Sequence, residues 1–191
     1  MKFIHKMQHG SFETWTETPD FPFLKVKQVH GTDIVSPETL PAEADGLMSS
    51  WDDLSIPLGI QTADCMPIVF EGKIGVVTLH AGWKGLANGI LNRAEISLIQ
   101  PERVYIGPSI QKCCFEVSPD FEENFKNSMH FIKKDEKFFF DLQAEAISQI
   151  NKLYPTVEVQ NSGLCTCHQL EFHSHRRDKT KSRNWNLYIK G

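Results

Sequence analysis

Three short apolar runs near the middle of the chain constrain its fold more than any other feature. Ile56–Gln61, Pro67–Phe70 and Ile74–His80 are rich in isoleucine and valine, which is typical of buried β-strands. The turn Glu71-Gly72-Lys73 separates the last two runs and predicts a hairpin. The core of this protein is therefore expected to contain closely spaced, buried strands.

Helical periodicity replaces this pattern further along the chain. Apolar residues recur on one face across Lys84–Ile99, which predicts a helix that ends before Pro101. A second helix is predicted over Asp141–Tyr154, capped by Asp141, and a short one over Pro119–Lys126. Further strands are predicted at Phe23–His30, Val104–Ile106, Val157–Val159 and Trp185–Ile189. Alternating strands and helices in 191 residues, without a repeat or linker, predict an α/β fold in a single domain, residues 1–191.

The composition excludes several classes of protein. With 40% hydrophobic and 23% charged residues, the chain lies in the range of globular proteins. The longest charge-free run, Val159–Leu170, is largely polar and too short for a membrane-spanning helix. Met1–Gly10 has no apolar stretch behind it, so we expect no signal peptide and a cytoplasmic location. A net charge of −4 disfavours nucleic acid as a partner.

Eight histidines and five cysteines stand out. An odd number of cysteines without a secretion signal argues against a disulfide framework and leaves free thiols. His30, Cys65 and His80 fall at the ends of predicted strands or in the loops that follow them, where a scaffold can hold metal ligands rigidly. Two imidazoles and one thiolate suit zinc, and three protein ligands leave a fourth position open for water. The candidate catalytic group is then a zinc-bound water, whose pKa the metal lowers to roughly 7. Spacing alone leaves the alternative open that these are ordinary core or surface residues.

Two other interpretations of the cysteines remain open. Cys113-Cys114 and Cys165-Thr166-Cys167-His168 have the ligand types of a closed structural zinc site. Adjacent cysteines do not easily reach one ion, so packing as small buried residues is the simpler expectation for Cys113 and Cys114. Cys65 and His80 also have the residue types of the nucleophile and base of a metal-independent cysteine hydrolase.

The last 21 residues carry six cationic side chains against two anionic ones. This pattern suggests a local anion site, and a solvated charge cluster is the alternative that composition alone favours. Arg176 and Arg177 offer bidentate donors for a phosphate or carboxylate. His173 and His175 share one face if this segment is an edge strand. The glycine-flanked turn at Lys84 is a weaker candidate for binding an anion through backbone N–H groups.

Seven motifs occur in one order along the chain. They are Gln28-Val29-His30-Gly31-Thr32-Asp33, Ala44-Asp45-Gly46, Thr62-Ala63-Asp64-Cys65-Met66-Pro67, His80-Ala81-Gly82-Trp83-Lys84-Gly85, Ile106-Gly107-Pro108, Phe115-Glu116-Val117 and Ser174-His175-Arg176-Arg177-Asp178. Together they resemble the YfiH-type proteins, also described as laccase-domain or polyphenol oxidoreductase proteins. The resemblance implies an α/β fold of mixed β-sheets covered by helices, with zinc bound by His30, Cys65 and His80.

The resemblance also implies chemistry on purine nucleosides. The expected reaction is phosphorolysis of adenosine, inosine or methylthioadenosine to the free base and ribose 1-phosphate, with adenosine deamination as a second activity. Phosphorolysis needs an anion pocket beside the ribose, and deamination needs hydroxide at C6 of adenine. Arg176, Arg177 and Lys84 are the candidates for binding phosphate, and Gln28 and Asp64 are further candidates for substrate contacts. The expected partners are a purine nucleoside and phosphate, with no nucleic acid or membrane; the sequence predicts no oligomeric state.

Other functions stay open as alternatives. Some family members are linked to editing of peptidoglycan precursors, which would make this chain a hydrolase. Copper outcompetes zinc at sites of two histidines and one cysteine, so oxidation of polyphenols is another possibility, as is a non-catalytic metal-binding module. The chain departs from the family at Lys181, where members usually have glycine, and in Gly10–Asp20, which lacks the usual arginine- and glycine-rich segment. We expect both departures to affect substrate contacts more than the metal.

Overall fold

The structure is a computed structural model that describes residues 2–191, and strands make up most of its regular structure. The strands are β1 (Lys2–Lys6), β2 (Gly10–Trp15), β3 (Leu24–Lys25), β4 (Ile34–Val35), β5 (Gly46–Ser50), β6 (Leu58–Thr62), β7 (Met66–Gly72), β8 (Gly75–Ala81), β9 (Pro101–Ile106), β10 (Glu116–Val117), β11 (Phe131–Lys134), β12 (Lys137–Phe140), β13 (Glu158–Asn161) and β14 (Asn184–Lys190). The helices are α1 (Trp83–Ala87), α2 (Ala94–Leu98), α3 (Leu142–Leu153) and α4 (His175–Asp178), with the 3-10 helices η1 (Pro37–Thr39), η2 (Ile90–Asn92) and η3 (Pro119–Asn124). No helix among the described residues is long and apolar enough to cross a membrane.

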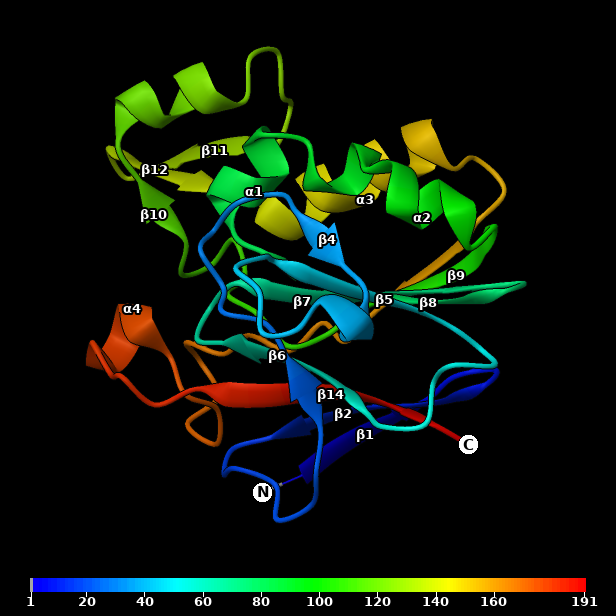
Figure 1. Cartoon of the computed structure of the whole chain (residues 1–191). Helices are drawn as coiled ribbons and strands as arrows, with labels where there is room; N and C mark the ends of the chain where they lie inside the picture. Colours follow the sequence, from blue (N-terminus) through cyan, green and yellow to red (C-terminus); the bar gives the residue numbers. More distant parts are fainter. Residues whose placement is uncertain (1) are drawn as a thin grey trace.

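Two large mixed sheets and one small sheet build the fold. Their strand orders are β13-β9-β7-β8-β5-β4, β1-β2-β14-β6-β3 and β10-β12-β11. In the large sheets, the parallel pairs β13–β9, β4–β5 and β3–β6 stand beside antiparallel neighbours. The six-stranded sheet lies between the helices α1 to α3 and the five-stranded sheet (Figure 1). The predicted α/β fold with mixed sheets is confirmed, with helices covering one face of the central sheet and strands covering the other.

Residues of β7 alternate between two hydrophobic cores, because successive side chains of a strand point to opposite faces. Ile68 and Phe70 belong to the core beneath the helices, together with Ile150 of α3. Val69 belongs to the core shared with the five-stranded sheet, together with Tyr188 of β14. All five side chains are buried. Both faces of β7 are thus covered, which explains why its residues Met66–Phe70 form a continuous apolar run.

The predicted hairpin and the predicted helix over Asp141–Tyr154 are confirmed. Strands β7 and β8 pair antiparallel, with Phe70 opposite Val77. Asp141 caps α3, because its side chain accepts a hydrogen bond from the N–H of Ala144 at 3.0 Å. Both features depend on contacts between residues close in sequence, so local signals were sufficient to find them.

The prediction of one continuous helix over Lys84–Ile99 is wrong. The chain turns at Gly89, whose φ of 84° lies in the left-handed region that favours glycine, and α1, η2 and α2 replace the single helix. Leu86, Ile90 and Ile96 nevertheless all enter the core beneath the helices. The apolar periodicity therefore predicted which residues are buried, but it did not predict that the helix is interrupted.

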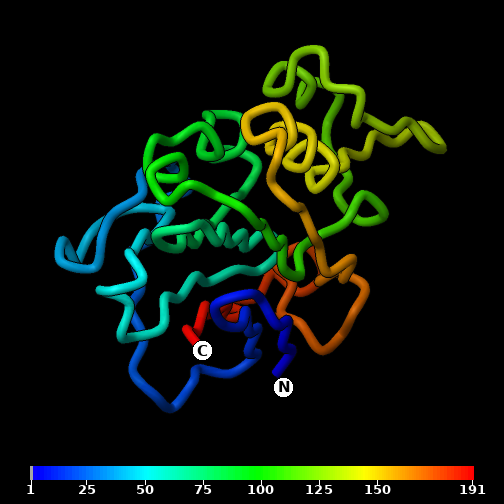
Figure 2. Tube along the Cα trace, turned by 90° about the vertical axis from the view of Figure 1, so that its right-hand side faces the viewer, coloured from blue at the N-terminus to red at the C-terminus, as the bar shows by residue number. Residues whose placement is uncertain are grey.

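Other elements also differ from the prediction. Within Phe23–His30 the strand is limited to Leu24–Lys25, and Lys27 adds an isolated parallel bridge to Glu43. The short helix over Pro119–Lys126 is the 3-10 helix η3. Strands β1 and β2 form an antiparallel hairpin that the sequence did not reveal. The segment from β10 to β12 projects beyond the two large sheets (Figure 2).

Candidate metal centre and its cavity

His30, Cys65 and His80 come together in the structure. One ligand atom from each lies within 4.8 Å of the others. His30 lies in the loop after β3, Cys65 in the loop between β6 and β7, and His80 near the end of β8. Three separate segments thus converge at one end of the sheets. His30 adopts a φ of 61°, a left-handed conformation uncommon outside glycine that turns the backbone sharply at this point.

Asp45 positions two of the three ligands. Its Oδ1 lies 2.7 Å from Nδ1 of His80, and the carboxylate also accepts hydrogen bonds from the backbone N–H groups of Val29, His30 and Gly31 at 2.6–3.2 Å. The Asp45 side chain is fully buried. A carboxylate on Nδ1 fixes the tautomer of a histidine and leaves Nε2 as its free ligand atom. Asp45 therefore orients His80 directly and His30 through the backbone.

Glycine at position 82 makes room for the ligands. A Cβ atom there would lie 3.0 Å from Sγ of Cys65 and 3.5 Å from Cδ2 of His30. At Gly85, a Cβ atom would lie 2.9 Å from the carbonyl oxygen of Gly31. The glycines of the segment after His80 thus allow α1 to approach the ligand loops closely.

Cys65 and His80 favour the charged form of each other. Burial raises the pKa of the Cys65 thiol, but hydrogen bonds from His30 and His80 and their positive charges outweigh burial and lower that pKa to about 6. Burial lowers the pKa of His80, but Asp45 and Cys65 outweigh burial and raise that pKa to about 9. Cys65 is therefore a thiolate at neutral pH, which is the form that binds metals.

The donor set fits a tetrahedral zinc ion. Zinc accepts imidazole nitrogen and thiolate sulfur, and catalytic zinc sites have three protein ligands and one open position. The hydrogen bond between His80 and a buried carboxylate is the second contact that zinc-bound histidines commonly make. Copper accepts the same two-histidine, one-cysteine set, so the donors fit either metal.

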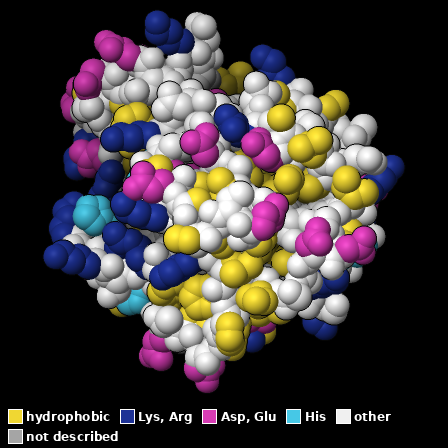
Figure 3. All heavy atoms as spheres, in the orientation of Figure 1, with side chains coloured by type: hydrophobic (Ala, Val, Ile, Leu, Met, Phe, Trp, Pro, Cys, Tyr) yellow, Lys and Arg dark blue, Asp and Glu magenta, His cyan; other side chains and the backbone are white. Residues whose placement is uncertain are grey.

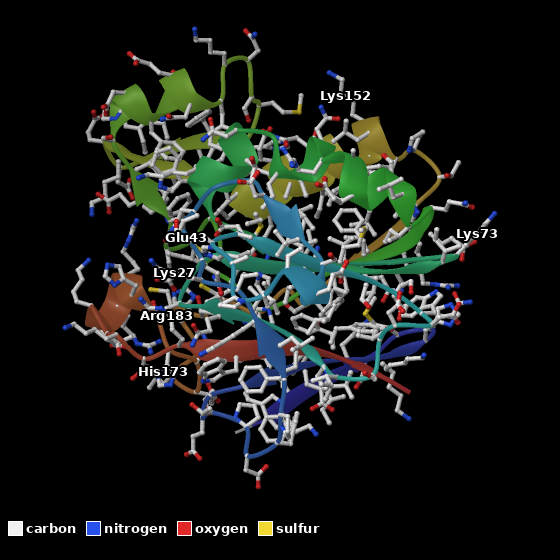
Figure 4. The ribbon with its side chains drawn as sticks, viewed as in Figure 1. Lys27, Glu43, Lys73, Lys152, His173 and Arg183 are labelled. Carbon is white, nitrogen blue, oxygen red and sulfur yellow. The ribbon has the colours of Figure 1, made fainter. Side chains whose placement is uncertain are left out.

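A cavity of about 940 Å³ opens in front of the three ligands, which is the size of a small-molecule site. Its walls combine cationic, acidic and apolar side chains: Lys25, Lys27, Glu43, Ile110, Phe115, His175, Arg176 and Arg183. Lys27, Glu43 and Arg183 come from three segments and lie close together at its rim (Figure 4). Lysine, arginine and histidine side chains gather over α4 and this rim (Figure 3). The cavity thus has a metal-ligand floor and a largely cationic edge.

The two neighbouring arginines have different positions. Arg176 lines the cavity, and its guanidinium lies 5.5 Å from the centre of the Phe115 ring. Its Nη1 donates to the carbonyl oxygens of Cys114 and Glu116, both at 3.0 Å. The guanidinium of Arg177 turns away: it donates to the carbonyl oxygens of Thr166, Cys167, Gln169 and Phe172 and to the carboxylate of Asp178. Arg177 therefore fixes a loop, and Arg176 faces the cavity.

Gln28 and Asp64 line the cavity but have structural partners. Nε2 of Gln28 donates to the carbonyl oxygen of Gln61, and Oε1 accepts from its N–H, both at 2.7 Å. Oδ1 of Asp64 accepts from Oγ1 of Thr166 at 2.7 Å, and Oδ2 accepts from the N–H of Arg176 at 2.6 Å. Asp64 thus ties the loop that carries Cys65 to α4.

Two expectations for the other basic residues change. His173 and His175 do not share a strand, because α4 begins at His175; His175 lines the cavity, whereas Nε2 of His173 lies 2.8 Å from the carbonyl oxygen of Thr16. Lys84 is exposed beside the Trp83 ring. Among residues 2–191, the cavity walls include neither Lys84 nor Arg177.

Sequence reasoning left several residues of the site without a role. Asp45 lies in one of the quoted motifs, yet a carboxylate that acts on ligands 15 and 35 residues away gives no local signal. Phe115 also lies in a motif. Lys27 and Arg183 lie among other charged residues, and nothing in the sequence singles them out. A search for acidic residues within the motifs would have found Asp45.

Comparisons with known proteins identify the family of the chain and support its fold. Residues 9–189 match the family model described as multi-copper polyphenol oxidoreductase laccase. The chain is 34% identical over 155 residues to a purine nucleoside phosphorylase of Aquifex aeolicus, covering 78% of this chain and 72% of the relative. It is 30% identical over 170 residues to purine nucleoside phosphorylase YfiH of Escherichia coli, covering 83% and 70%. A solved Neisseria meningitidis protein of the DUF152 family superposes with a TM-score of 0.78 at 29% identity, covering 89% of this chain and 76% of that protein. The Bacillus licheniformis hypothetical protein YfiH superposes with a TM-score of 0.74 at 25% identity, covering 88% and 74%.

Proposed function

The chain belongs to the YfiH-type family described as multi-copper polyphenol oxidoreductase laccases, and from this membership we propose that it is a zinc-dependent purine nucleoside phosphorylase. The observation that carries the proposal is the cluster of His30, Cys65 and His80 on the floor of a cavity with a cationic rim. The names of its relatives support the same activity. Adenosine, inosine and methylthioadenosine are the proposed nucleosides, and adenosine deamination is the proposed second activity.

The cationic rim is suited to bind phosphate. In phosphorolysis a phosphate oxygen forms a bond to C1′ of the ribose, while the bond from C1′ to the purine nitrogen breaks and its electron pair leaves with the base. The guanidinium of Arg176 and that of Arg183 line the cavity and would hold the phosphate dianion beside the ribose. Phe115 lies in the same wall and presents an apolar surface for the purine ring.

His30, Cys65 and His80 would hold zinc at the wall of the same cavity. Bound there, zinc supplies Lewis acidity and the activated water that deamination requires at C6 of adenine. Asp45 keeps His80 in one tautomer, and the glycine at position 82 leaves the Cys65 sulfur accessible. We propose zinc as the resident metal rather than copper, which metal analysis of protein purified without added metal tests directly.

The test incubates the zinc-loaded protein with adenosine, with and without inorganic phosphate. Adenine that forms only with phosphate supports phosphorolysis, and inosine that forms in both mixtures supports deamination. Cys65→Ser, which removes one ligand, is the matched control and should form neither product. If fully zinc-loaded wild-type protein forms neither adenine nor inosine, the proposal is wrong.

One observation favours a second candidate function. The Cys65 sulfur, the His80 imidazole and the Asp45 carboxylate form a connected series, which is also the arrangement of a nucleophile, its base and the group that orients the base. This arrangement would serve a cysteine hydrolase without a metal. Hydrolytic activity that survives complete removal of zinc and is abolished by alkylation of Cys65 would support the cysteine hydrolase over the zinc enzyme.

A further inference from the structure

A second group of cysteine and histidine side chains lies outside the site described above. Cys113 and Cys114 follow β9, and Cys165 and His168 follow β13. Sγ of Cys113 lies 3.6 Å from Sγ of Cys114, 3.8 Å from Sγ of Cys165 and 3.5 Å from Nδ1 of His168. All four ligand atoms lie within 4.8 Å of one another. Two segments about 50 residues apart therefore place three sulfurs and one imidazole around one point.

The three separations from Cys113 match the edges of a zinc tetrahedron. Ligands at zinc–sulfur distances of about 2.3 Å and tetrahedral angles lie about 3.8 Å apart, and a sulfur and a nitrogen at about 2.0–2.1 Å lie about 3.6 Å apart. The three observed distances fall within about 0.2 Å of these values. The sulfur atoms are too far apart for a disulfide, whose bond is about 2.05 Å, and all five cysteines are free thiols.

Apolar packing does not account for the cluster. Cys113 and His168 are exposed, Cys114 is half-buried, and Cys165 alone is buried, so the expectation that Cys113 and Cys114 serve as small buried residues is not met. Exposed thiols gain little from packing, whereas four converging donors at the surface are accessible to an ion.

Two tight turns solve the difficulty of adjacent cysteines reaching one ion. The carbonyl oxygen of Gln111 accepts from the N–H groups of both Cys114 and Phe115, and that of Cys165 accepts from the N–H of Gln169. A parallel bridge between Ser109 and Cys165 holds the two turns against each other. The turns curl the backbone so that both neighbouring sulfurs face the opposite loop.

We propose that Cys113, Cys114, Cys165 and His168 bind a second zinc ion, in a closed structural site. Four protein ligands complete the tetrahedron and leave no position for water, which is the property that separates structural from catalytic zinc. The ion would join the loop before β10 to the loop before α4. This inference does not depend on the proposed activity, because it concerns different ligands.

The two loops carry one wall of the cavity, so the ion would act on substrate binding at a distance. The carbonyl oxygen of Cys114 accepts from Arg176, and Phe115 lies beneath the same guanidinium. On the other loop, Thr166 donates to Asp64, next to the ligand Cys65. Loss of the second zinc is therefore expected to loosen the Arg176 wall and to raise KM for phosphate more than it lowers kcat.

The experiment titrates zinc into metal-free protein and counts the ions that remain bound after gel filtration. We expect two zinc ions per wild-type chain and one in each single-ligand variant. In His168→Ala and Cys113→Ser the remaining ion should be the one at the cavity. In Cys65→Ser it should be the one in the four-ligand group. The matched control is Cys167→Ser, which alters a thiol of the same loop outside the four-ligand group and should keep both ions. His168→Cys, which restores four ligands, should also keep both.

Cobalt in place of zinc gives a second measurement, which needs no substitution in the four-ligand group. Wild-type protein should gain a strong sulfur-to-cobalt charge-transfer absorption from the cluster, and Cys65→Ser should retain most of it because three of the four thiolate ligands remain. One zinc per wild-type chain that is lost in Cys65→Ser would overturn the proposal. So would two zinc ions retained in both His168→Ala and Cys113→Ser, or a Cys113–Cys114 disulfide in protein kept under reducing conditions.

Discussion

The two cysteine and histidine clusters of this molecule use similar donors in opposite settings. His30, Cys65 and His80 lie at the floor of a cavity, with Asp45 buried behind them. The second cluster lies on two loops at the surface, and four of its own side chains surround one point. Three ligands with a rigid support leave a place for substrate, whereas four ligands close the shell. In the proposed assignment, the number of protein ligands and the depth of the site therefore separate a reactive metal from a structural one.

The largest effect is expected from a substitution that disrupts the first cluster and leaves the second intact. Cys65→Ser removes a ligand, so zinc at the cavity and nucleoside phosphorolysis should both be lost. Changes to residues that only orient a ligand cost about 10- to 100-fold in affinity or activity, and direct loss of a ligand should exceed about 100-fold. Steady-state rates of adenine release with phosphate, together with bound zinc per chain, measure the effect. Full activity in Cys65→Ser would contradict any role for the cluster in catalysis.

Asp45→Asn tests the buried carboxylate that orients His80 in the first cluster. An amide keeps the shape of Asp45 but weakens its hold on Nδ1 of His80, so zinc affinity at the cavity should fall by about 10- to 100-fold. Zinc competition with a chromophoric chelator measures the change. Asp33→Asn is the control, because the Asp33 side chain is 70% exposed. The zinc affinity of this variant should stay at the wild-type value. Unchanged affinity in Asp45→Asn would show that the histidine is oriented by packing alone.

Arg177→Ala tests the loop of the second cluster. Alanine would leave the carbonyl oxygens of Thr166, Cys167, Gln169 and Phe172 without this donor, and leaving buried acceptors unpaired costs about 1–3 kcal/mol. Urea unfolding should therefore show a lower free energy of unfolding, while zinc at the cavity remains bound. Lys181→Ala, at an exposed position, is the control and should unfold like the wild type. Wild-type stability together with a raised KM for phosphate would instead place Arg177 at the substrate.

The sequence predicts those elements of the fold that depend on contacts between residues close together in the chain. The apolar runs of β7 and β8 and the cap and periodicity of α3 act between near neighbours, and they were predicted. The hairpin of β11 and β12 was missed because its turn uses Asp135 and Glu136, both with positive φ, in place of the asparagine and glycine that usually mark such turns. The break after α1 was missed because one glycine inside a helical pattern does not by itself end a helix.

The candidate site divides in the same way. The three candidate ligands could be proposed from their residue types and from the ordered motifs that contain them, although His30 lies in a loop and not at the strand end that was predicted. The different roles of Arg176 and Arg177 could not be predicted from the sequence. The two residues are adjacent and have the same chemistry, and they differ only in the direction in which α4 points their side chains. The second cluster was recognised by residue type, but its geometry depends on two turns that meet only in the folded chain.

Arg176→Ala should have a smaller effect than loss of a ligand, because Arg183 also lines the cavity. Removing one charge-assisted contact to phosphate should raise KM for phosphate by about tenfold. The free energy of unfolding should change less than in Arg177→Ala, because Arg176 bonds two carbonyl oxygens rather than four. Phosphate-dependent initial rates at saturating adenosine measure KM. An unchanged KM would exclude Arg176 as a phosphate ligand and move that role to Arg183.

Lys84→Ala should have the smallest effect, although the sequence placed Lys84 among the candidates for phosphate. The side chain is exposed, and its Nζ lies 5.6 Å from the centre of the Trp83 ring, away from the cavity walls. An exposed cation near an aromatic ring contributes about 0.5–1 kcal/mol, so the melting temperature should fall by a few degrees at most while KM for phosphate and both zinc ions stay unchanged. Kinetics measured beside Arg176→Ala give the contrast. A tenfold rise in KM in Lys84→Ala, with none in Arg176→Ala, would place phosphate at the start of α1 and would remove the cationic rim from the proposed mechanism.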